Sequence, residues 1–329
     1  MPSHPRWPAL LRVLGAFAFA LAAMPGAAEI LSTDAGGTLV RLAMPARRIV
    51  SLAPNITELV YAAGAGERLV GNVDFGNYPA AAGRVSRVGS HDRIDLEAVV
   101  ALRPDLVLGW RSGNPAAAIA RLRALGVVVY LSEPGRIADI AGELEAIGRL
   151  AGTEVAASAA ARAFRERLAS LEARHSGRPE VRVFYQVWKQ PLVTVNGRQV
   201  ISDALRICGG RNIFADLPAL APTVSVEGVL AADPDAIVAS GMDEARPEWL
   251  DDWRRWPRLR AVAEGNLYFV PPDLIQRHTP RILDGTEIRF GGTKRLDIGE
   301  QTAKFMSDAE LDRCTEVFES RGISVHCHR

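Results

Sequence analysis

Short apolar runs alternate along this chain with segments in which apolar residues recur at helical spacing. The first run, Ile49 to Leu52, precedes a predicted helix that ends at Gly64 and that Asn55 or Thr57 is expected to cap. Further predicted helices cover 95–102, 116–125, 137–151, 154–174 and 202–208, and further predicted strands cover 69–73, 106–108, 127–131, 181–187, 236–239 and 267–270. Such alternation is typical of parallel sheets covered by helices, so the pattern predicts an α/β fold.

The segment 154–174 differs from the other predicted helices because it is rich in Ala, Arg and Glu and contains no Gly or Pro. These residues are strong helix formers. At about 1.5 Å per residue, the helix would be roughly 30 Å long, which is the diameter of one small domain. A new series of strands and helices follows it directly. We therefore interpret it as a rigid connection between two lobes; an ordinary surface helix is the alternative.

A sequence pattern recurs in the two halves of the chain. Residues 97–108 read EAVVALRPDLVL, and residues 227–238 read EGVLAADPDAIV. In both, a Glu precedes a Pro-Asp turn by the same spacing and a short apolar strand follows; Gly126 and Gly265 then each precede a further strand. The repeat predicts two similar α/β lobes, because its period is too long for a solenoid.

The N-terminus has the pattern of a secretory signal. Arg6 and Arg12 accompany an apolar run from Val13 to Met24, and small residues end at Ala28. The run is shorter than the roughly 20 residues that span a bilayer, so we expect cleavage near Ala28 and export to a periplasm rather than a membrane anchor. The predicted organisation is a signal peptide 1–28, an N-terminal lobe 29–152, a linker helix 153–178, a C-terminal lobe 179–285 and an atypical tail 286–329.

Composition narrows the classes of function. The 329 residues carry a formal net charge of +1, which gives no reason to expect nucleic acid as a partner. With 48% hydrophobic residues, the chain is long enough and apolar enough for sizeable cores. Its three cysteines, Cys208, Cys314 and Cys327, leave one over in any intramolecular pairing, and their connectivity stays open.

The chain has none of the common catalytic motifs that we sought. No Gly-rich phosphate loop follows a strand, and no Gly-x-Ser-x-Gly motif occurs. Cys208 stands in an apolar context and is interpreted as a core or disulfide cysteine. The run His326-Cys327-His328 has metal-ligand side chains, although such a cluster at a terminus is more often incidental. We therefore expect a binding protein and no enzyme.

Aromatic and polar residues follow the predicted strands, at the edge where ligands bind in open α/β sheets. Together they predict a cleft for a large, flat, partly apolar ligand, although core packing is the alternative for each residue alone. Arg277 has a second alternative, an ion pair between the lobes. The aromatic members are Phe75, Tyr78, His91, Trp110 and Trp188, and the polar members are Asp74, Asp273, Arg277 and His278.

Several segments resemble the periplasmic binding proteins for cobalamin, haem and iron siderophores. The run RIVSLAPNITE at 48–58 resembles the opening of that family, and 96–114 and 205–214 are most similar to its cobalamin branch. Residues 225–227 and 279–282 fit as well, so the resemblance extends from about 47 to 285. It implies two Rossmann-like α/β lobes joined by one long helix. A corrinoid ligand would bind between the lobes and pass to the permease dimer of an ABC importer.

The resemblance also implies roles for individual residues. Glu97 and Glu227, one on each lobe, would meet arginines of the two permease subunits. Their alternative is a carboxylate near a helix N-terminus, which is favoured by about 0.3–1 kcal/mol. The resemblance places Phe75, His91 and Trp110 at ligand-contacting positions and Asp273 and Arg277 near the mouth of the cleft. Together with residues at the strand ends, the expected ligand-binding set is Pro54, Asp74, Phe75, Tyr78, His91, Trp110, Trp188, Asp273 and Arg277.

The chain also departs from the cobalamin branch. Phe75 replaces a Tyr, and His91 and Ala221 replace Trp residues; the family's final helix, whose cysteine pairs with the one matching Cys208, is absent. Binding of haem or an iron siderophore is therefore the alternative function. A more distant one is an exported metal-dependent enzyme that would use His91, His278 and the tail. We expect a monomer with no resident cofactor or metal and no membrane insertion after cleavage.

Overall fold

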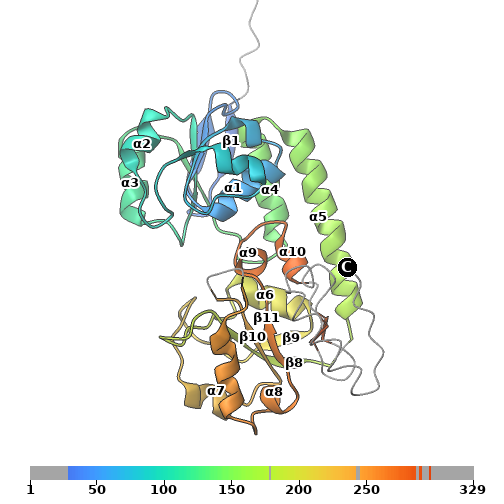
Figure 1. Ribbon diagram of the computed structural model, residues 1–329. Coiled ribbons are helices and arrows are strands. Elements are labelled where there is room, and N and C mark those ends of the chain that lie inside the picture. Colours follow the sequence, from blue (N-terminus) through green and yellow to red (C-terminus); the bar gives the residue numbers. More distant parts are fainter. Residues whose placement is uncertain (1–28, 178, 242–244, 287–288, 291–295, 298–329) are drawn as a thin grey trace, which may run out of the picture.

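The computed structural model describes residues 29–177, 179–241, 245–286, 289–290 and 296–297. Figure 1 shows two lobes, one above the other, and the helix α5 (Glu154–His175) runs along one side from the first to the second. The predicted signal peptide and the His326-Cys327-His328 run lie outside the described residues. None of the helices in the described part is both long and apolar enough to cross a membrane.

The N-terminal lobe is built on a five-stranded parallel sheet in the order β5-β4-β3-β6-β7. Its strands are β3 (Ile49–Ser51), β4 (Leu69–Asn72), β5 (Ser86–Arg87), β6 (Leu106–Trp110) and β7 (Val129–Ser132). Its helices are α1 (Pro54–Ala62), α2 (Leu96–Ala101), α3 (Ala116–Ala124) and α4 (Asp139–Ala151), with 3-10 turns at Gly66–Arg68 and Ala80–Arg84. An antiparallel hairpin of β1 (Ile30–Thr33) and β2 (Leu39–Leu42) precedes the sheet.

The C-terminal lobe repeats this design with a four-stranded parallel sheet in the order β11-β10-β8-β9. Its strands are β8 (Val181–Gln186), β9 (Gly210–Asn212), β10 (Ala236–Ala239) and β11 (Leu267–Phe269). Its helices are α6 (Val200–Ile207), α7 (Val226–Ala232), α8 (Arg260–Ala263), α9 (Pro272–Ile275) and α10 (Ile282–Gly285), with a 3-10 helix at Glu248–Arg255. A short antiparallel pair, β12 (Arg289–Phe290) and β13 (Leu296–Asp297), follows.

Each face of the N-terminal sheet buries a separate layer of helices. Ile56, Leu59 and other residues of α1 pack with Ile140 and Leu144 of α4 on one face. Residues of α2 and α3, among them Val99 and Leu122, cover the other face. The strands are buried on both faces: Ile49 and Leu106 join the first layer, and their neighbours Val50 and Val107 join the second. This arrangement confirms the predicted α/β fold.

The helix α5 joins the cores of the two lobes. Its buried residues recur every three or four positions, at Ala157, Ala161, Phe164, Leu168 and Leu171. This stripe belongs to one apolar cluster that also contains residues of α1, α4, α6 and β8. Because the helix packs on both lobes, it is a supported connection rather than a free linker, and the predicted architecture of two lobes joined by one long helix is confirmed.

The sequence repeat is a structural repeat. In the first copy, Asp95 caps α2 by accepting the N–H of Ala98. In the second copy, Ser225 caps α7 by accepting the N–H of Gly228. Each helix then leads through a Pro-Asp turn into a central strand, β6 or β10. Arg103 in the first turn has a positive φ of 45°, a conformation that is rare for residues other than Gly.

Matching polar contacts hold the two Pro-Asp turns. Asp105 accepts the backbone N–H of Arg48, and Asp235 accepts that of Arg182, at 2.9 Å in both cases. The guanidinium of Arg48 donates to the carbonyl of Leu102 at the end of α2. The guanidinium of Arg182 donates to the corresponding carbonyls at the end of α7. The Asp of each repeat is therefore a structural residue that ties the helix-strand turn to the neighbouring strand.

The predicted cap of α1 is wrong. The helix begins at Pro54, and its N-cap Ala53 offers no side-chain hydrogen bond. Proline is favoured at the first helical position because its φ is already helical and its missing N–H would have had no partner there. Thr57 lies inside the helix, buried, and its hydroxyl donates to Ser51 Oγ at 2.9 Å.

Candidate functional site

A cavity of about 360 Å³ lies between the two lobes. Its N-terminal wall is formed by residues that directly follow β6 and β7, so it lies at the carboxyl edge of that sheet, where the sequence predicts the cleft. The opposite wall comes from the loop before α6, the start of α6 and the segment after α9. The lining residues are Arg111, Ser112, Glu133, Pro134, Gly135, Arg198, Gln199, Val200, Leu220 and His278.

Trp110 forms an aromatic contact between the lobes. It ends β6, and its ring is half-buried. The ring of His91 lies 6.3 Å from it, centroid to centroid, on the same lobe. The ring of His278, from the other lobe, meets it edge-on at 5.7 Å. Edge-to-face contacts of this kind are favourable in addition to the area they bury, so Trp110 and His278 help to fix the relative position of the lobes.

Asn114 fixes the backbone on which Trp110 and His91 stand. It is buried, and its Oδ1 accepts the backbone N–H of Trp110 at 2.7 Å. Its Nδ2 donates to the carbonyls of Leu52 at 2.8 Å and His91 at 2.9 Å. One amide therefore connects the ends of two strands with the His91 loop. The sequence gives no sign of this role, because the partners are distant along the chain.

Gly113 lies directly beneath the Trp110 ring. A Cβ built at this position would stand 1.8 Å from an atom of the indole. That distance is far below van der Waals contact, so any other residue at 113 would displace the ring. The absence of a side chain at 113 thus contributes to the orientation of Trp110.

His278 is buried against Trp110 and lines the cavity. Only 3% of the residue is exposed, and its Nδ1 is buried without a hydrogen-bond partner. Burial lowers the pKa of His278, and the nearby carboxylate of Glu133 opposes this only in part. The imidazole is therefore neutral at pH 7. Buried polar atoms in native proteins usually have a hydrogen-bond partner, so the Nδ1 atom of His278 is an exception.

Phe75 and Tyr78 expose their rings on the N-terminal lobe, after β4. Phe75 is 73% exposed and has a φ of 61°, a left-handed conformation that is an outlier for a bulky residue. Tyr78 is 46% exposed, and the guanidinium of Arg281 from the other lobe lies 3.9 Å from its ring centroid. Asp74 is exposed beside Phe75. Exposed aromatic rings on a strained loop are typical of a binding surface.

Two further predicted residues occupy strand or helix ends. Pro54 is the first residue of α1 and is half-buried. Trp188 follows β8 and is 40% exposed; its Nε1 donates to the carbonyl of Gln190 at 3.1 Å. Both stand at the carboxyl edge of their sheets. Their contact with a ligand stays a prediction.

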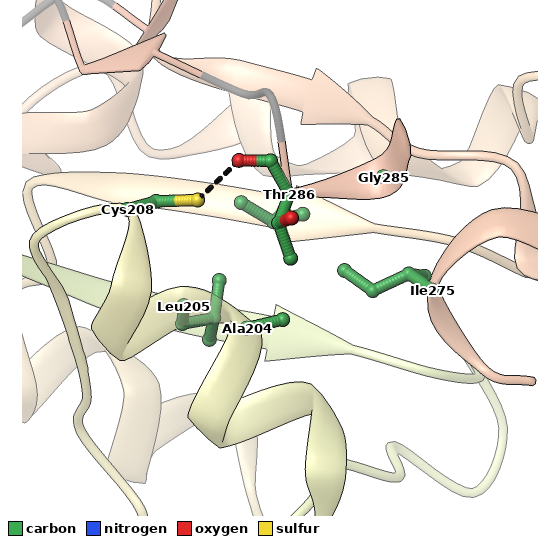
Figure 2. A pocket seen from close by; sticks show the side chains of 7 residues that line it. Ala204, Leu205, Cys208, Ile275, Gly285 and Thr286 are labelled. Carbon is green, nitrogen blue, oxygen red and sulfur yellow. Dashed lines mark hydrogen bonds between the residues drawn. The ribbon is translucent and has the colours of Figure 1, made fainter. Parts of the chain in front are cut away.

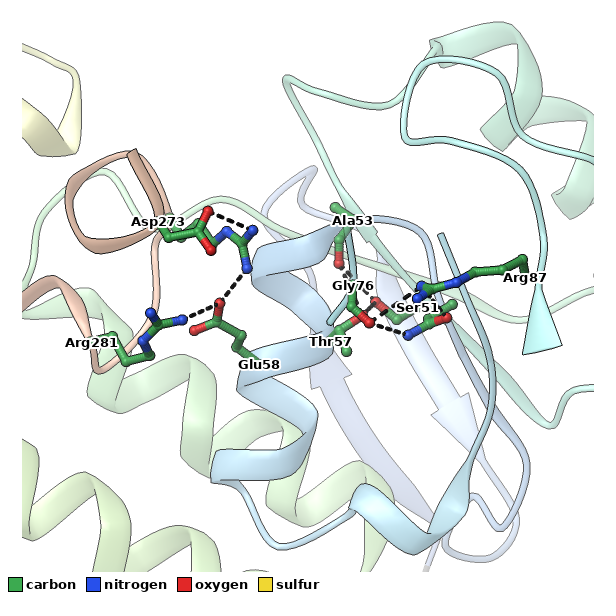
Figure 3. Close-up of polar contacts among 10 residues, drawn as sticks. Ser51, Ala53, Thr57, Glu58, Gly76, Arg87, Asp273 and Arg281 are labelled. Carbon is green, nitrogen blue, oxygen red and sulfur yellow. Dashed lines mark hydrogen bonds and ion pairs between the residues drawn. The ribbon is translucent and has the colours of Figure 1, made fainter. Parts of the chain in front are cut away.

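Asp273 and Arg277 belong to an ion cluster that joins the lobes. Arg277 pairs with Asp273 at 2.6 Å and, across the cleft, with Glu58 of α1 at 2.7 Å, so the interlobe ion pair considered for it is present. Arg281 also pairs with Glu58, at 3.1 Å. Figure 3 shows Glu58 reaching from α1 towards Arg281 and towards the segment that carries Asp273. The sequence does not single out Glu58, because its partners are more than two hundred residues away.

Replacing Glu58 with Gln should destabilise the protein. The carboxylate is 3% exposed and pairs with Arg277 and Arg281, whose side chains are only 12% and 20% exposed. Its removal leaves two arginines with less compensation, but Arg277 keeps Asp273 and Arg281 keeps the Tyr78 ring. We expect a loss of about 1–2 kcal/mol in the free energy of urea unfolding.

A matched control is Glu180→Gln, which removes an exposed partner of Arg211 at 2.6 Å. It should change stability by less than about 0.5–1 kcal/mol. Equal losses in the two variants would show that the Glu58 cluster contributes no more to stability than a surface pair.

A second carboxyl shielded from water is that of Glu143 on α4. The hydroxyl of Tyr130 donates to it at 3.3 Å. Burial raises the pKa of Glu143 to about 7, and the carboxylates of Asp139 and Glu133 add to the rise, although the hydrogen bond from Tyr130 opposes it. The protein is therefore more stable with this group protonated.

Stability should fall as the pH rises through the titration of Glu143. A pKa raised from 4.5 to about 7 in the folded state gives a contribution that is complete below pH 4.5 and lost above pH 7. At about 1.4 kcal/mol per unit, the loss is roughly 3 kcal/mol. Glu143→Gln should remove this dependence and be the more stable protein at pH 8 in urea unfolding. Glu145→Gln, on the exposed face of the same helix, should keep the wild-type pH profile, and parallel profiles for all three proteins would contradict the assignment.

The two repeat glutamates are exposed at the starts of equivalent helices. Glu97 is the second residue of α2, and Glu227 is the second residue of α7. Neither carboxylate has a hydrogen-bond or ion-pair partner in the described part of the chain. Because each helix runs antiparallel to the strand that follows it, its start lies at the carboxyl edge of the sheet, beside the cleft. Figure 1 shows α2 and α7 on different lobes, both away from α5.

Cys208 is a buried thiol at the end of α6, and it forms no disulfide within the described residues. Burial raises the pKa of its thiol to about 12, so it is a poor nucleophile at neutral pH. Figure 2 shows it in a small apolar pocket between α6 and the segment 275–286, where its Sγ donates to the carbonyl of Thr286 at 2.8 Å. Cys314 and Cys327 lie outside the described residues, so the connectivity of the three cysteines stays open.

No three His, Cys, Asp or Glu side chains within the described ranges are grouped so that they could hold a metal ion. His91 and His278 both contact Trp110, but within those ranges they belong to no such group. The proposed metal-dependent enzyme would also need the tail, whose histidines lie outside those ranges.

Comparison with known proteins places these features in context. A family model described as periplasmic binding protein matches residues 49–274. A vitamin B12-binding protein of Vibrio parahaemolyticus is 37% identical over 243 residues, which are 73% of this chain and 86% of that protein. The vitamin B12-binding protein of Vibrio cholerae serotype O1 is 36% identical over 251 residues, 76% of this chain and 90% of that protein.

Solved structures with the same fold include proteins with different ligands. The crystal structure of the periplasmic vitamin B12 binding protein BtuF of Vibrio cholerae has a TM-score of 0.69 and 36% identity, and the match covers 74% of this chain and 94% of that one. A periplasmic haem-binding protein from Pseudomonas aeruginosa has a TM-score of 0.65 and 25% identity over 73% of this chain and 90% of that one.

Proposed function

The chain belongs to the periplasmic binding protein family, and from that membership we propose that it captures cobalamin or a related corrinoid between its lobes. The observation that carries the proposal is the identity of 36% with BtuF over 94% of that chain. It is supported by an interlobe cavity that His278 lines, with the ring of Trp110 in contact with His278. A corrin ring is broad, flat and largely apolar at its faces, which suits aromatic side chains.

The function consists of binding the corrinoid and releasing it, and it includes no chemical reaction. The chain is exported to the periplasm, its signal peptide is cleaved near Ala28, and it acts as a monomer. It delivers the corrinoid unchanged to the permease dimer of an ABC importer. Glu97 and Glu227, one per lobe beside the cleft, are exposed, and their carboxylates have no partner among the described residues. This supports docking on two like subunits.

Haem or an iron complex is the second candidate cargo. The observation that favours it is the pair of imidazoles, His91 and His278, beside Trp110. Neutral imidazole is a good ligand for iron and cobalt, and burial keeps His278 neutral by lowering its pKa.

A titration of the mature protein separates the two candidates. Calorimetry with cyanocobalamin, followed in parallel by quenching of tryptophan fluorescence, should give micromolar or tighter binding at one site per chain. Haemin should bind more weakly under the same conditions. Absence of cobalamin binding, or tighter binding of haemin, would overturn the proposed cargo.

A further inference from the structure

We propose that Arg111 and Arg198 form an anion-binding subsite in the interlobe cavity, and that it recognises the phosphodiester of a nucleotide-bearing corrinoid. This inference rests on the proposed function, since it concerns which corrinoid the cleft selects. The two arginines come from opposite lobes and line the same cavity. Guanidinium groups suit phosphate because their N–H donors match its oxygens in pairs.

Neither arginine is neutralised by a carboxylate within the described residues. Arg111 is exposed directly after Trp110, and its side chain has no hydrogen-bond or ion-pair partner there. Arg198 is exposed on the other wall, and its guanidinium donates to the carbonyl of Pro218. Two positive charges thus remain available to a ligand in the cavity.

The acid that lines this cavity is already engaged. Glu133 accepts the backbone N–H of Ser112 at 2.7 Å and the Ser112 hydroxyl at 3.0 Å. It also accepts the indole N–H of Trp110 at 3.3 Å. These contacts hold the carboxylate on its own wall, where it positions Trp110 instead of pairing with the arginines.

The start of α6 adds to the positive character of the cavity. Gln199 caps the helix by accepting the N–H of Ile201 at 3.0 Å, and both Gln199 and Val200 line the cavity. A helix N-terminus favours an anion through its free N–H groups and its dipole. Asp203, in the first turn of this helix, accepts the N–H of Ile137 at 2.8 Å and pairs with Arg206, so it is directed elsewhere.

His278 provides an independent indication of a ligand. It lines the cavity, only 3% of it is exposed, and its Nδ1 has no hydrogen-bond partner among the described residues. A neutral imidazole can donate one N–H to a phosphate oxygen. Burial of a polar atom without a partner costs about 1–3 kcal/mol, which a ligand that supplied the partner would recover.

A subsite for phosphate would distinguish corrinoids that carry a phosphodiester from those that do not. A complete cobalamin carries a phosphodiester in its nucleotide loop, whereas cobinamide has the same corrin ring without that loop. The subsite therefore predicts selection of the complete vitamin over its nucleotide-free precursor. The carboxylates of haem offer the same negative charge, so haemin belongs in the test.

The test compares cobalamin and cobinamide by calorimetry in excess cyanide, so that both carry two cyanides on cobalt and differ in the nucleotide loop. Wild type should bind cobalamin at least about tenfold more tightly than cobinamide. Arg111→Gln and Arg198→Gln should each weaken cobalamin binding about fivefold to tenfold and change cobinamide binding less than about twofold. Arg258→Gln, in a separate cavity near the end of α7, is the matched control and should affect neither ligand.

The outcomes distinguish this inference from the proposed function. Equal losses for both corrinoids, or no loss, would overturn the phosphodiester subsite while corrinoid binding stands. A loss confined to haemin would show that the arginines recognise carboxylates and would also overturn it. Failure of wild type to bind either corrinoid would overturn the proposed function itself, and this inference with it.

Discussion

Replacement of Trp110 by alanine should weaken cobalamin binding at least about 30-fold. A tryptophan at the centre of a binding site typically contributes 2 kcal/mol or more, and each 1.4 kcal/mol is a factor of ten. Trp110 stands at the end of β6 and contacts both His91 and the cavity-lining His278, so its loss removes an aromatic ring next to the cavity and an interlobe contact together. Calorimetry with cyanocobalamin measures the effect directly.

Two further variants separate the ring from its orientation. Trp110→Phe keeps an aromatic face and loses the hydrogen bond to Glu133, so it should cost less than a third of the free energy lost in Trp110→Ala. Gly113→Ala keeps the tryptophan at position 110. The added Cβ would stand 1.8 Å from the indole ring, so the ring must move. It should therefore weaken binding almost as much as Trp110→Ala. Wild-type affinity in Gly113→Ala would contradict the assigned position of the ring.

Local signals in the sequence suffice for much of this fold. The Pro-Asp turns, the glycines before the strands and the apolar spacing of residues 137–151 are all short-range features, and the structure has a helix or strand at each of them. The equivalence of Asp105 and Asp235 was readable because both copies keep the same spacing. The start of α1 was misassigned because Asn55 and Thr57 are common caps, whereas Pro54 took the first helical position.

Less of the site can be predicted from the sequence, because its contacts join segments that are distant along the chain. Glu58 meets Arg277 and Arg281 only after both lobes have folded, and neither spacing nor composition links them. Asn114 bonds to backbone atoms of Trp110 and His91, and every residue type has those atoms, so the sequence does not reveal these contacts. The left-handed backbone of Phe75 cannot be predicted from the sequence either, because a bulky residue disfavours a positive φ.

Reversing the charges of Glu97 and Glu227 together should abolish delivery of the ligand while leaving its capture intact. Both carboxylates are exposed and have no partner among the described residues, and they occupy equivalent positions on the two lobes. A like-charge contact across an interface costs several kcal/mol, so two at once should reduce uptake about 100-fold or more. Each single Glu→Lys variant should reduce it about tenfold. Uptake of labelled cobalamin through the permease of the same organism, at subsaturating protein, is the measurement.

Glu154→Lys is the control that separates docking from helix stability. Glu154 is exposed in the first turn of α5, so its reversal perturbs the helix dipole as the other two do, by about 0.3–1 kcal/mol. It lies on the connecting helix, away from the lobe surfaces that carry Glu97 and Glu227. Uptake should therefore be normal in Glu154→Lys, and all variants should bind cyanocobalamin with wild-type affinity. If the double variant transports normally, the two carboxylates merely favour the starts of their helices. If it loses cobalamin binding as well, the glutamates act on the cleft and not on the importer.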